Sequence, residues 1–568
     1  MIKIFTILAL VFSFSSNIFA NNLEKGDIVL KAMKSEMTRT MNKLQLDDLK
    51  KPYFVSYYVA DSSSYYVSAS FGDIKNKDFN INRYGKTDIR IGDKKFDNYN
   101  YIGNSFSDYK PFSSSLPIED DYDVLRRTLW LLSDKAYKDA LQKYSQKDSY
   151  RQKRNIKEID GDMTDEKSQT YIEASEKLEA FDFEYYCGKI KELSNLFRAY
   201  PDLKSSDISF NWGLGVKRFI NSEGTLYKKS SGGVVITANL TTQNEDGYKI
   251  SGNKDFIYKK PSEINFPQLR KDIENMAEDY SKATRAKNIN FYVGPVIFEG
   301  EAASEFFNQL FISNISFAPM PWAEQDSYLK YYYSIPKLTD KIGMRIFPPF
   351  ISAYDNPLEE KYEDIGLFGN YKIDGEGIIP EKLELVERGK LKNIYLSRTP
   401  YKEFKKSNGH GRMTSDSFAT AGAGNVFINS EKKVSYAKLK KKLIQMGLDL
   451  ELDYVVLIKS IQSYKSTQKY LGDPILAYKL DLKTKIESPL SIVEFEGLTM
   501  RALRDIVLTS DKSKVYNFYQ SNPFAYSSGR YPTSIIAPEA VLVGEIELKK
   551  TNNKPDKLPY LKHPFFSK

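Results

Sequence analysis

The spacing of apolar residues changes near residue 290, and this change limits the possible folds more than any other feature. Before it, helical segments, in which apolar residues recur at three- and four-residue intervals, occur together with strand-like runs at 53–60, 65–71, 88–91, 216–220 and 233–240. After it, short strand-like runs dominate, and residues 475–482 alternate apolar and polar side chains as a half-buried strand does. The sequence therefore predicts an α+β fold, in which an N-terminal mixed α/β half with long helices precedes a C-terminal, mainly antiparallel β half.

The N-terminus has the features of a cleavable signal peptide. Lys3 is followed by an apolar run over residues 4–16, and Ala20 precedes the polar pair Asn21-Asn22. The apolar run is too short to cross a bilayer, which needs roughly 20 residues. We therefore expect an exported chain, periplasmic or extracellular, without a membrane span after signal cleavage.

Four segments follow from these patterns. They are a signal peptide at 1–20, an N-terminal α+β domain at 21–290, a C-terminal β-rich domain at 291–550 and a Pro- and Lys-rich tail at 551–568. Helices are expected near 30–44, 119–140, 185–198 and 267–280, and again at 302–311, 436–446 and 500–507. Residues 146–170 are polar and charged, which predicts a solvated helical extension or a loose loop.

Composition excludes several classes of function. The net charge of +9 is a small surplus of 83 basic over 74 acidic residues spread along the chain, so no nucleic-acid-binding stripe is expected. The single cysteine, Cys187, allows no internal disulfide and follows an aromatic run, which favours a buried, inert thiol.

Several motifs, taken in order, resemble the TldD/PmbA family, whose members are also described as modulators of gyrase and as zinc-dependent peptidases. They are D-I-R-I-G-D at 88–93, D-Y-D-V-L-R-R at 121–127, Y-V-G-P-V-I-F-E-G-E-A-A at 292–303, G-E-G at 375–377, S-N-G-H-G-R at 407–412 and L-T-M-R-A-L-R-D at 498–505. No single motif is diagnostic, but their order and spacing are fairly specific. The resemblance covers most of the chain after residue 20.

The resemblance implies that active members carry H-E-x-x-x-H on the helix after E-A-A. Two imidazoles and a later cysteine would bind zinc, and the glutamate would act on the metal-bound water. The corresponding positions in this chain are Asn308, Gln309 and Ser313, and no cysteine follows Cys187. Amide side chains are poor zinc ligands and do not accept protons at neutral pH. We therefore expect no metal, no cofactor and no catalytic residue at these positions.

The spacing of the motif also makes a structural demand. Positions five residues apart lie about 140° from each other around a regular helix. A site shared by residues 308 and 313 therefore requires the helix to end or bend between them.

Only two histidines could rebuild a site, and both have simpler interpretations. His563 lies in the tail, where solvation is expected. His410 lies between two glycines, close to Asn408 and Arg412, and this loop is the best candidate for a binding contact. The alternative is a hairpin turn at Asn408-Gly409 with a locally bonded imidazole.

Three functions remain open. The resemblance favours a non-catalytic, PmbA-like subunit that helps a zinc-bearing, TldD-like partner to bind or enclose an unfolded peptide for proteolysis. The alternative is a stand-alone exported binding or assembly protein, a monomer or homodimer, on a degenerate peptidase frame. The third is an active hydrolase with an unrecognised site.

Overall fold

The structure is a computed structural model. It describes residues 26–102, 110–173, 181–324, 333, 335–414, 417–463, 469–521 and 529–561. The predicted signal peptide at 1–20 and His563 lie outside these residues.

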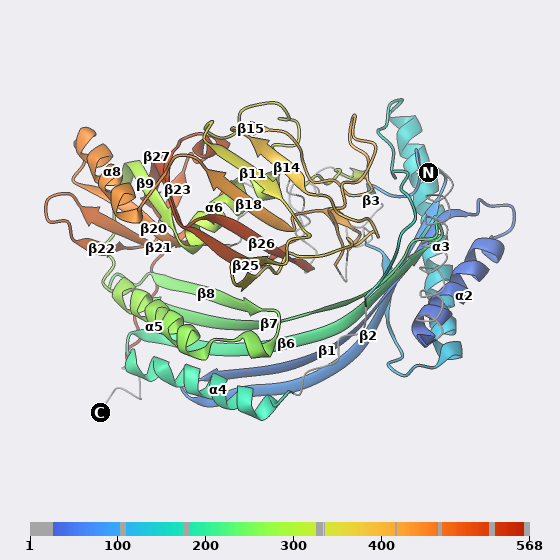
Figure 1. Cartoon of the computed structure of the whole chain (residues 1–568), viewed down its shortest axis with the longest axis horizontal. Coiled ribbons are helices and arrows are strands. Elements are labelled where there is room, and N and C mark those ends of the chain that lie inside the picture. Colours follow the sequence, from blue (N-terminus) through green and yellow to red (C-terminus); the bar gives the residue numbers. More distant parts are fainter. Residues whose placement is uncertain are drawn as a thin grey trace, which may run out of the picture.

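A strongly curved, mostly antiparallel sheet forms the N-terminal half (Figure 1). Its strand order is β4-β2-β1-β6-β7-β5, with β8 paired to β7. The strands are β1 (Pro52–Ser70), β2 (Asp73–Ile91), β4 (Phe112–Leu116), β5 (Thr170–Ile172), β6 (Leu203–Asn221), β7 (Leu226–Gln243) and β8 (Lys249–Tyr258). Strand signals at 53–60 and 65–71 belong to the single strand β1, because residues 61–64 pair with β2 on one side and β6 on the other.

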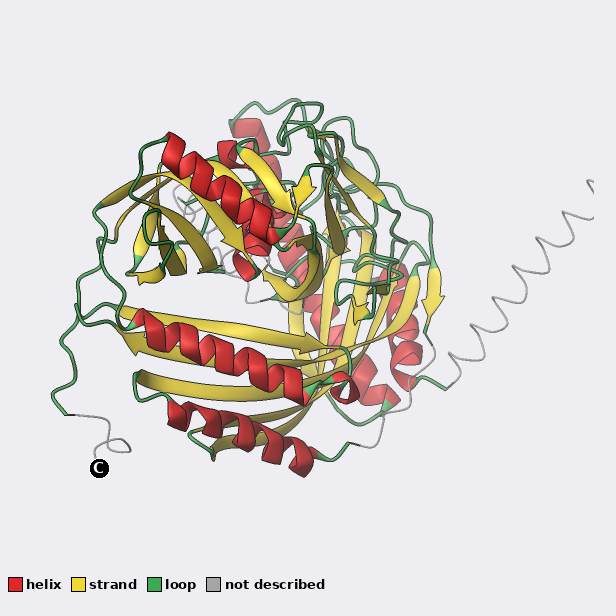
Figure 2. Ribbon diagram, turned by 60° about the vertical axis from the view of Figure 1, so that its left-hand side comes forward, coloured by secondary structure: helices red, strands yellow, loops and turns green. Residues whose placement is uncertain are grey.

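Four helices cover this sheet in two pairs, as Figure 1 shows. They are α2 (Ile28–Lys43), α3 (Tyr122–Lys153), α4 (Phe183–Asn195) and α5 (Phe266–Ala283), and they confirm the four helices expected before residue 290. The pair α2 and α3 packs at one end of the sheet, and α4 and α5 pack toward the other (Figure 2). Each helix begins at an Asp or Asn whose side chain accepts a first-turn N–H, which fixes where it starts.

The C-terminal half contains two sheets with the helix α6 (Glu301–Leu310) in contact with both. One sheet has the order β15-β14-β11-β18-β26-β25, and the other β19-β24-β27-β9-β20-β21-β22, with β23 on β27. Most pairs are antiparallel, as expected. The main strands are β9 (Phe291–Glu299), β11 (Ile351–Asp355), β14 (Leu383–Glu387), β18 (Asn425–Ser430), β20 (Tyr454–Ile461), β21 (Pro474–Asp481), β24 (Ile506–Ser510), β25 (Ser513–Ser521), β26 (Arg530–Pro538) and β27 (Ala540–Lys550).

Shorter strands complete the sheets, and a second helix, α8 (Tyr436–Asp449), confirms the helix expected near 436–446. The short strands are β15 (Lys390–Leu391), β19 (Lys433–Val434), β22 (Glu487–Leu490) and β23 (Val493–Glu496), with the pairs β3 (Tyr101–Ile102) and β10 (Trp322–Ala323), β12 (Lys361–Tyr362) and β13 (Ile365–Gly366), and β16 (Gly411–Arg412) and β17 (Thr420–Ala421).

The helix expected at 500–507 is wrong. Met500–Leu503 forms one 3₁₀ turn, and the chain then enters β24, which pairs with β27. The apolar residues that suggested the buried face of a helix belong to two elements: the first lie in the turn and the later ones in the strand β24. A short apolar run cannot distinguish the two by its period alone.

The polar segment at 146–170 is a helical extension in its first part, as expected, but it is not a loose loop afterwards. Lys147 on α3 is 2% exposed and donates to Asp162 Oδ2 at 2.7 Å and to the carbonyl of Tyr99 at 2.5 Å. Burial, together with the neighbouring Asp97, raises the pKa of Asp162 to about 6. A buried ion pair therefore holds this segment against the sheet, a contact that a charged sequence does not reveal.

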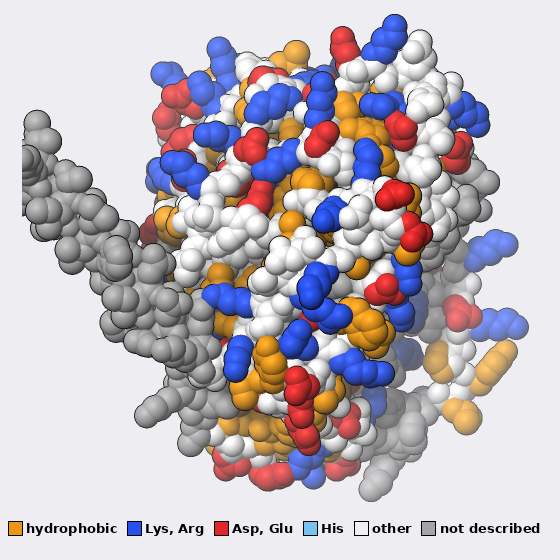
Figure 3. Space-filling view, turned by 90° about the vertical axis from the view of Figure 1, so that its right-hand side faces the viewer, with side chains coloured by type: hydrophobic (Ala, Val, Ile, Leu, Met, Phe, Trp, Pro, Cys, Tyr) orange, Lys and Arg blue, Asp and Glu red, His pale blue; other side chains and the backbone are white. Residues whose placement is uncertain are grey.

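Charges of both signs are mixed over the face at the α2–α3 end of the molecule, without a region of one sign (Figure 3). This distribution matches the small charge surplus of the sequence. Within the described ranges, no helix is long and apolar enough to cross a membrane.

Lys147→Met should destabilise the protein by about 3–5 kcal/mol, because it leaves Asp162 buried beside Asp97 without its cation. Lys138→Met is the matched control on the same helix, since its pair with Asp134 is exposed and contributes only about 0.3–0.5 kcal/mol. Urea unfolding of both variants measures the difference. Equal losses would show that the buried pair does not anchor the segment.

Candidate functional site

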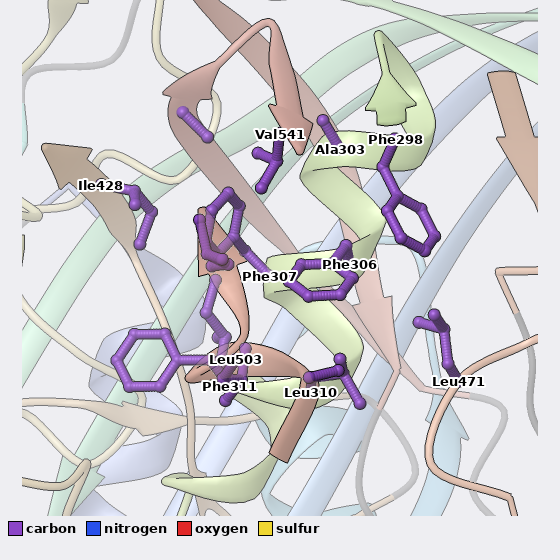
Figure 4. Close-up of a cluster of buried hydrophobic side chains, with 14 of the residues drawn as sticks. Phe298, Ala303, Phe306, Phe307, Leu310, Phe311, Ile428, Leu471, Leu503 and Val541 are labelled. Carbon is purple, nitrogen blue, oxygen red and sulfur yellow. The ribbon is translucent and has the colours of Figure 1, made fainter. Parts of the chain in front are cut away.

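The helix α6, which carries Asn308 and Gln309, lies in the core of the C-terminal half. Every residue from Ala302 to Leu310 is buried. Figure 4 shows Phe306, Phe307 and Leu310 among side chains from both neighbouring sheets. The burial of these apolar side chains stabilises α6 in its place between the sheets. Asn308 and Gln309 on the same helix are therefore held in place by the packing of their neighbours.

The helix α6 ends between Asn308 and Ser313, as a site shared by these two positions would require. The helix ends at Leu310, and Ile312–Asn314 forms a 3₁₀ turn that contains Ser313. Positions 308 and 313 are therefore not related by a regular helix.

A network of amide hydrogen bonds occupies the motif positions. Gln309 donates through Nε2 to Glu305 Oε2 at 2.9 Å and to the carbonyl of Gln462 at 2.8 Å. Its Oε1 accepts from the backbone N–H of Gly472 at 2.8 Å. Both ends of this amide are therefore engaged with protein groups.

The neighbouring motif positions are also bonded within the protein. Asn308 donates from Nδ2 to Glu305 Oε2 at 3.2 Å, and Gln520 donates from Nε2 to Ser313 Oγ at 3.2 Å. Asn308 and Gln309 thus share Glu305 as an acceptor, while Ser313 is bonded to a different residue, Gln520.

Glu305 is the acceptor at the centre of this cluster, and the sequence analysis missed it. It is 2% exposed, and Tyr516 Oη lies 3.2 Å from its Oε1 and 3.2 Å from Glu301 Oε1. Burial raises the pKa of Glu305 to about 7, while the bond from Gln309 acts in the opposite direction. Its position three and four residues before Asn308 and Gln309 is the sequence signal that could have identified it.

These residues do not fit a zinc ion. Zinc prefers imidazole, thiolate and carboxylate ligands, whereas Gln309 uses its oxygen and nitrogen in protein hydrogen bonds. In the part of the chain that the structure describes, no group of three or more His, Cys, Asp or Glu side chains is placed to hold a metal. We therefore derive no metal-dependent step for this chain.

The loop that carries His410 lies inside the C-terminal half. His410 is 0% exposed, and its Nδ1 is 3.0 Å from the carbonyl of Asn408, while Nε2 is 3.8 Å from Asp355 Oδ1. Arg412 is 7% exposed, stacks over the ring of Tyr371 at 4.2 Å and donates to the carbonyl of Pro532. The imidazole is locally bonded, as the alternative interpretation proposed, but in the interior and not at the surface.

Asn408 has a similar internal role. Its Oδ1 accepts from the N–H of Leu396, and its Nδ2 donates to the carbonyl of Ile394. The side-chain amide therefore bonds to backbone groups of residues 394–396 as a neighbouring strand would. The polar side chains of this loop are hydrogen-bonded within the protein, so no ligand is needed to account for them. The role of the loop as a binding contact stays a prediction, and the burial of His410 and Arg412 does not support it.

The G-E-G motif at 375–377 packs directly against this loop. Asp374 accepts N–H bonds from Glu376, Ile378 and Gly411, all at 2.8–2.9 Å. A side chain on Gly411 would begin 2.4 Å from Glu376 Oε2, so it would have to displace this carboxylate. The two segments are therefore closely packed.

Arg398 then connects this cluster to the N-terminal half. Its Nη1 lies 2.6 Å from Glu223 Oε2, its Nη2 donates to the carbonyl of Thr164, and its backbone N–H donates to Glu376. These motifs therefore join the two halves of the protein.

Comparison with known proteins agrees with this architecture. A model of the family described as "PmbA/TldA metallopeptidase C-terminal domain" matches residues 292–550. Residues 292–550 therefore belong to the TldD/PmbA family. A metalloprotease from Methanocaldococcus jannaschii is 25% identical over 231 residues, which are 40% of this chain and 46% of that protein. The match thus spans about half the length of this relative.

Solved structures extend the likeness of fold to nearly the whole chain. TldE from Thermococcus kodakarensis has a TM-score of 0.57 at 13% identity and covers 91% of this chain and 99% of its own. A protein described as a modulator of a DNA gyrase from Thermotoga maritima has a TM-score of 0.55 at 15% identity and covers 87% and 96%. At such low identities these likenesses establish the fold alone.

Glu305→Gln should change how stability depends on pH. The folded-state pKa of about 7 lies above the ordinary 4.5, so the folded protein binds this proton more tightly than the unfolded chain. The resulting stability is present at low pH and is lost as the pH rises from 4.5 to 7, by about 3 kcal/mol. The neutral glutamine should remove this loss.

Unfolding free energies at pH 5 and pH 8 measure the effect. Glu278→Gln, an exposed glutamate on α5, is the control and should keep the wild-type pH dependence. An identical pH dependence in Glu305→Gln and wild type would contradict the shifted pKa of Glu305.

Proposed function

We propose that this protein is an exported, non-catalytic member of the TldD/PmbA family. It pairs with a zinc-bearing, TldD-like member and helps to bind or enclose an unfolded peptide that the partner cleaves. The single observation that carries the proposal is the network around Gln309. An amide bonded at both ends to protein groups stands where a catalytic glutamate would act on metal-bound water.

The preserved frame supports a binding role over loss of all function. The helix still ends before Ser313, and Asn308 Nδ2 and Ser313 Oγ are hydrogen-bonded within the protein. Asn308 Oδ1, in contrast, is buried without a hydrogen-bond partner in the described residues, and such a group is costly to keep in a core that has no function.

Export is supported by the sequence at residues 1–20 and by the position of the first helix. The helix α2 starts at Ile28 with Asp27 as its N-cap. Cleavage after Ala20 would therefore leave every described helix and strand intact. The compartment would be the periplasm or the medium.

The proposed partner would supply the metal ligands, because the described residues of this chain include no group of side chains placed to bind a metal. The likeness in fold to TldE, together with the metalloprotease named among the relatives, supports a pairing with a metal-bearing member of the same family. The alternative is a stand-alone exported binding or assembly protein, active as a monomer or homodimer.

Purification of the tagged chain from the exported fraction of its source cell tests the proposal. The mature chain should begin at Asn21, and a stoichiometric partner that carries H-E-x-x-x-H should co-purify. Cleavage of an unfolded peptide should require this partner and should stop on chelation, since a catalytic zinc needs about three protein ligands.

Two results would contradict the proposal. A lone monomer or homodimer without a partner would favour the stand-alone alternative. Chelator-sensitive cleavage by this chain alone would instead indicate an active hydrolase with a site that the motif does not reveal.

A further inference from the structure

A cavity of about 760 Å³ lies between the two halves of the protein, beside the N-terminus of α6. Its walls come from α5 and β8 of the N-terminal half and from α6, α8, β20 and β25 of the C-terminal half. Its volume lies within the range of roughly 300–1,000 Å³ that ligand pockets occupy. Glu301 lines the cavity, and the Tyr516 hydroxyl connects it to Glu305 of the amide network.

Two strand edges border this cavity. In the described residues, β8 pairs only with β7, and β25 is the last strand of its sheet. The two strands approach each other where the halves meet, as Figure 1 shows. Asn253 and Lys254 of β8 and Lys514 of β25 line the cavity. An edge strand directs alternate N–H and C=O groups away from its sheet, so β8 offers main-chain partners to an occupant.

The lining carries charges of both signs. Lys254 and Lys514 act electrostatically on Glu301, whose pKa is raised mainly by burial. A second group lies around Asp279, which accepts from Tyr478 Oη at 2.8 Å and is 3.3 Å from Lys459 Nζ. Such a wall does not select one sign of charge, unlike a phosphate or nucleic-acid site.

Apolar atoms contribute more of the lining than polar atoms do. Met276, Tyr280 and Leu476 are large apolar residues of the lining, and all three belong to the hydrophobic core of the N-terminal sheet. An occupant would therefore contact apolar side chains, charged groups and the edge of a strand. An extended peptide matches all three, since its side chains alternate along the chain and its N–H and C=O groups can pair with a strand edge.

We infer that this cavity binds a short extended segment of peptide, which adds to the free edge of β8 and is held by the charged side chains around it. The inference rests on the proposed function, because it places the unfolded peptide at one site of this chain. It assigns a binding role to the junction of the two halves.

A thiol-directed block tests this site without altering the core. Cys187 is the only cysteine of the sequence and is 2% exposed, so Asn253→Cys would provide the one accessible thiol. Lys249→Cys on the same strand is the matched control, because it is exposed and lies outside the cavity lining. Each variant is coupled to a bulky maleimide, and binding of a short, proline-free fluorescent peptide is measured by anisotropy.

The blocked Asn253→Cys protein should lose about tenfold or more in affinity, while the blocked Lys249→Cys protein should bind as wild type does. A peptide N-methylated at alternate residues, which lacks the donors for strand pairing, should bind the unmodified protein with a similar loss.

Equal binding by the two blocked proteins, or no effect of N-methylation, would overturn the cavity assignment while leaving the proposed function intact. No peptide binding by the unmodified chain, alone or with its partner, would overturn both. Melting curves of the labelled variants confirm that a lost affinity does not reflect unfolding.

Discussion

The burial of α6 between two sheets is the constraint on which the rest of the structure depends. Phe306, Phe307 and Leu310 fill the space between β20 and β26, and a core of this kind does not tolerate a shifted helix. The end of α6 therefore stays in one place whatever its polar residues are. This rigidity holds Asn308, Gln309 and Ser313 in place, where they make hydrogen bonds with other protein groups.

The same burial sets the electrostatics of the region. Glu305 lies in the core with a raised pKa because few groups solvate its charge, and the amides of Asn308 and Gln309 provide its nearest donors. Glutamine is suited to this position because it donates to Glu305 and accepts from Gly472 at the same time. A glutamate at residue 309 would place a second carboxylate beside Glu305, so the present network and a catalytic glutamate exclude each other.

The fold class and most helices could be predicted from the sequence, because they depend on local periodicity and on N-caps such as Asp27. What the sequence could not provide were contacts between distant segments. Lys147 and Asp162 form a buried pair that composition suggests is solvated. His410 lies in the interior although its glycine neighbours suggest a surface loop. Tyr516 lies more than two hundred residues from Glu305, and its hydroxyl reaches that carboxylate only because β25 runs beside α6.

The central claim is that the amide network has replaced the metal in this chain. Elemental analysis of the purified mature protein, after mild chelation and dialysis against zinc-free buffer, tests it most directly. The account predicts no stoichiometric zinc, because both ends of the Gln309 amide are bonded to protein groups and the described residues contain no metal-binding cluster. One tightly held zinc ion per chain would contradict the account, because a site of that affinity requires ligands of the kind that these positions lack.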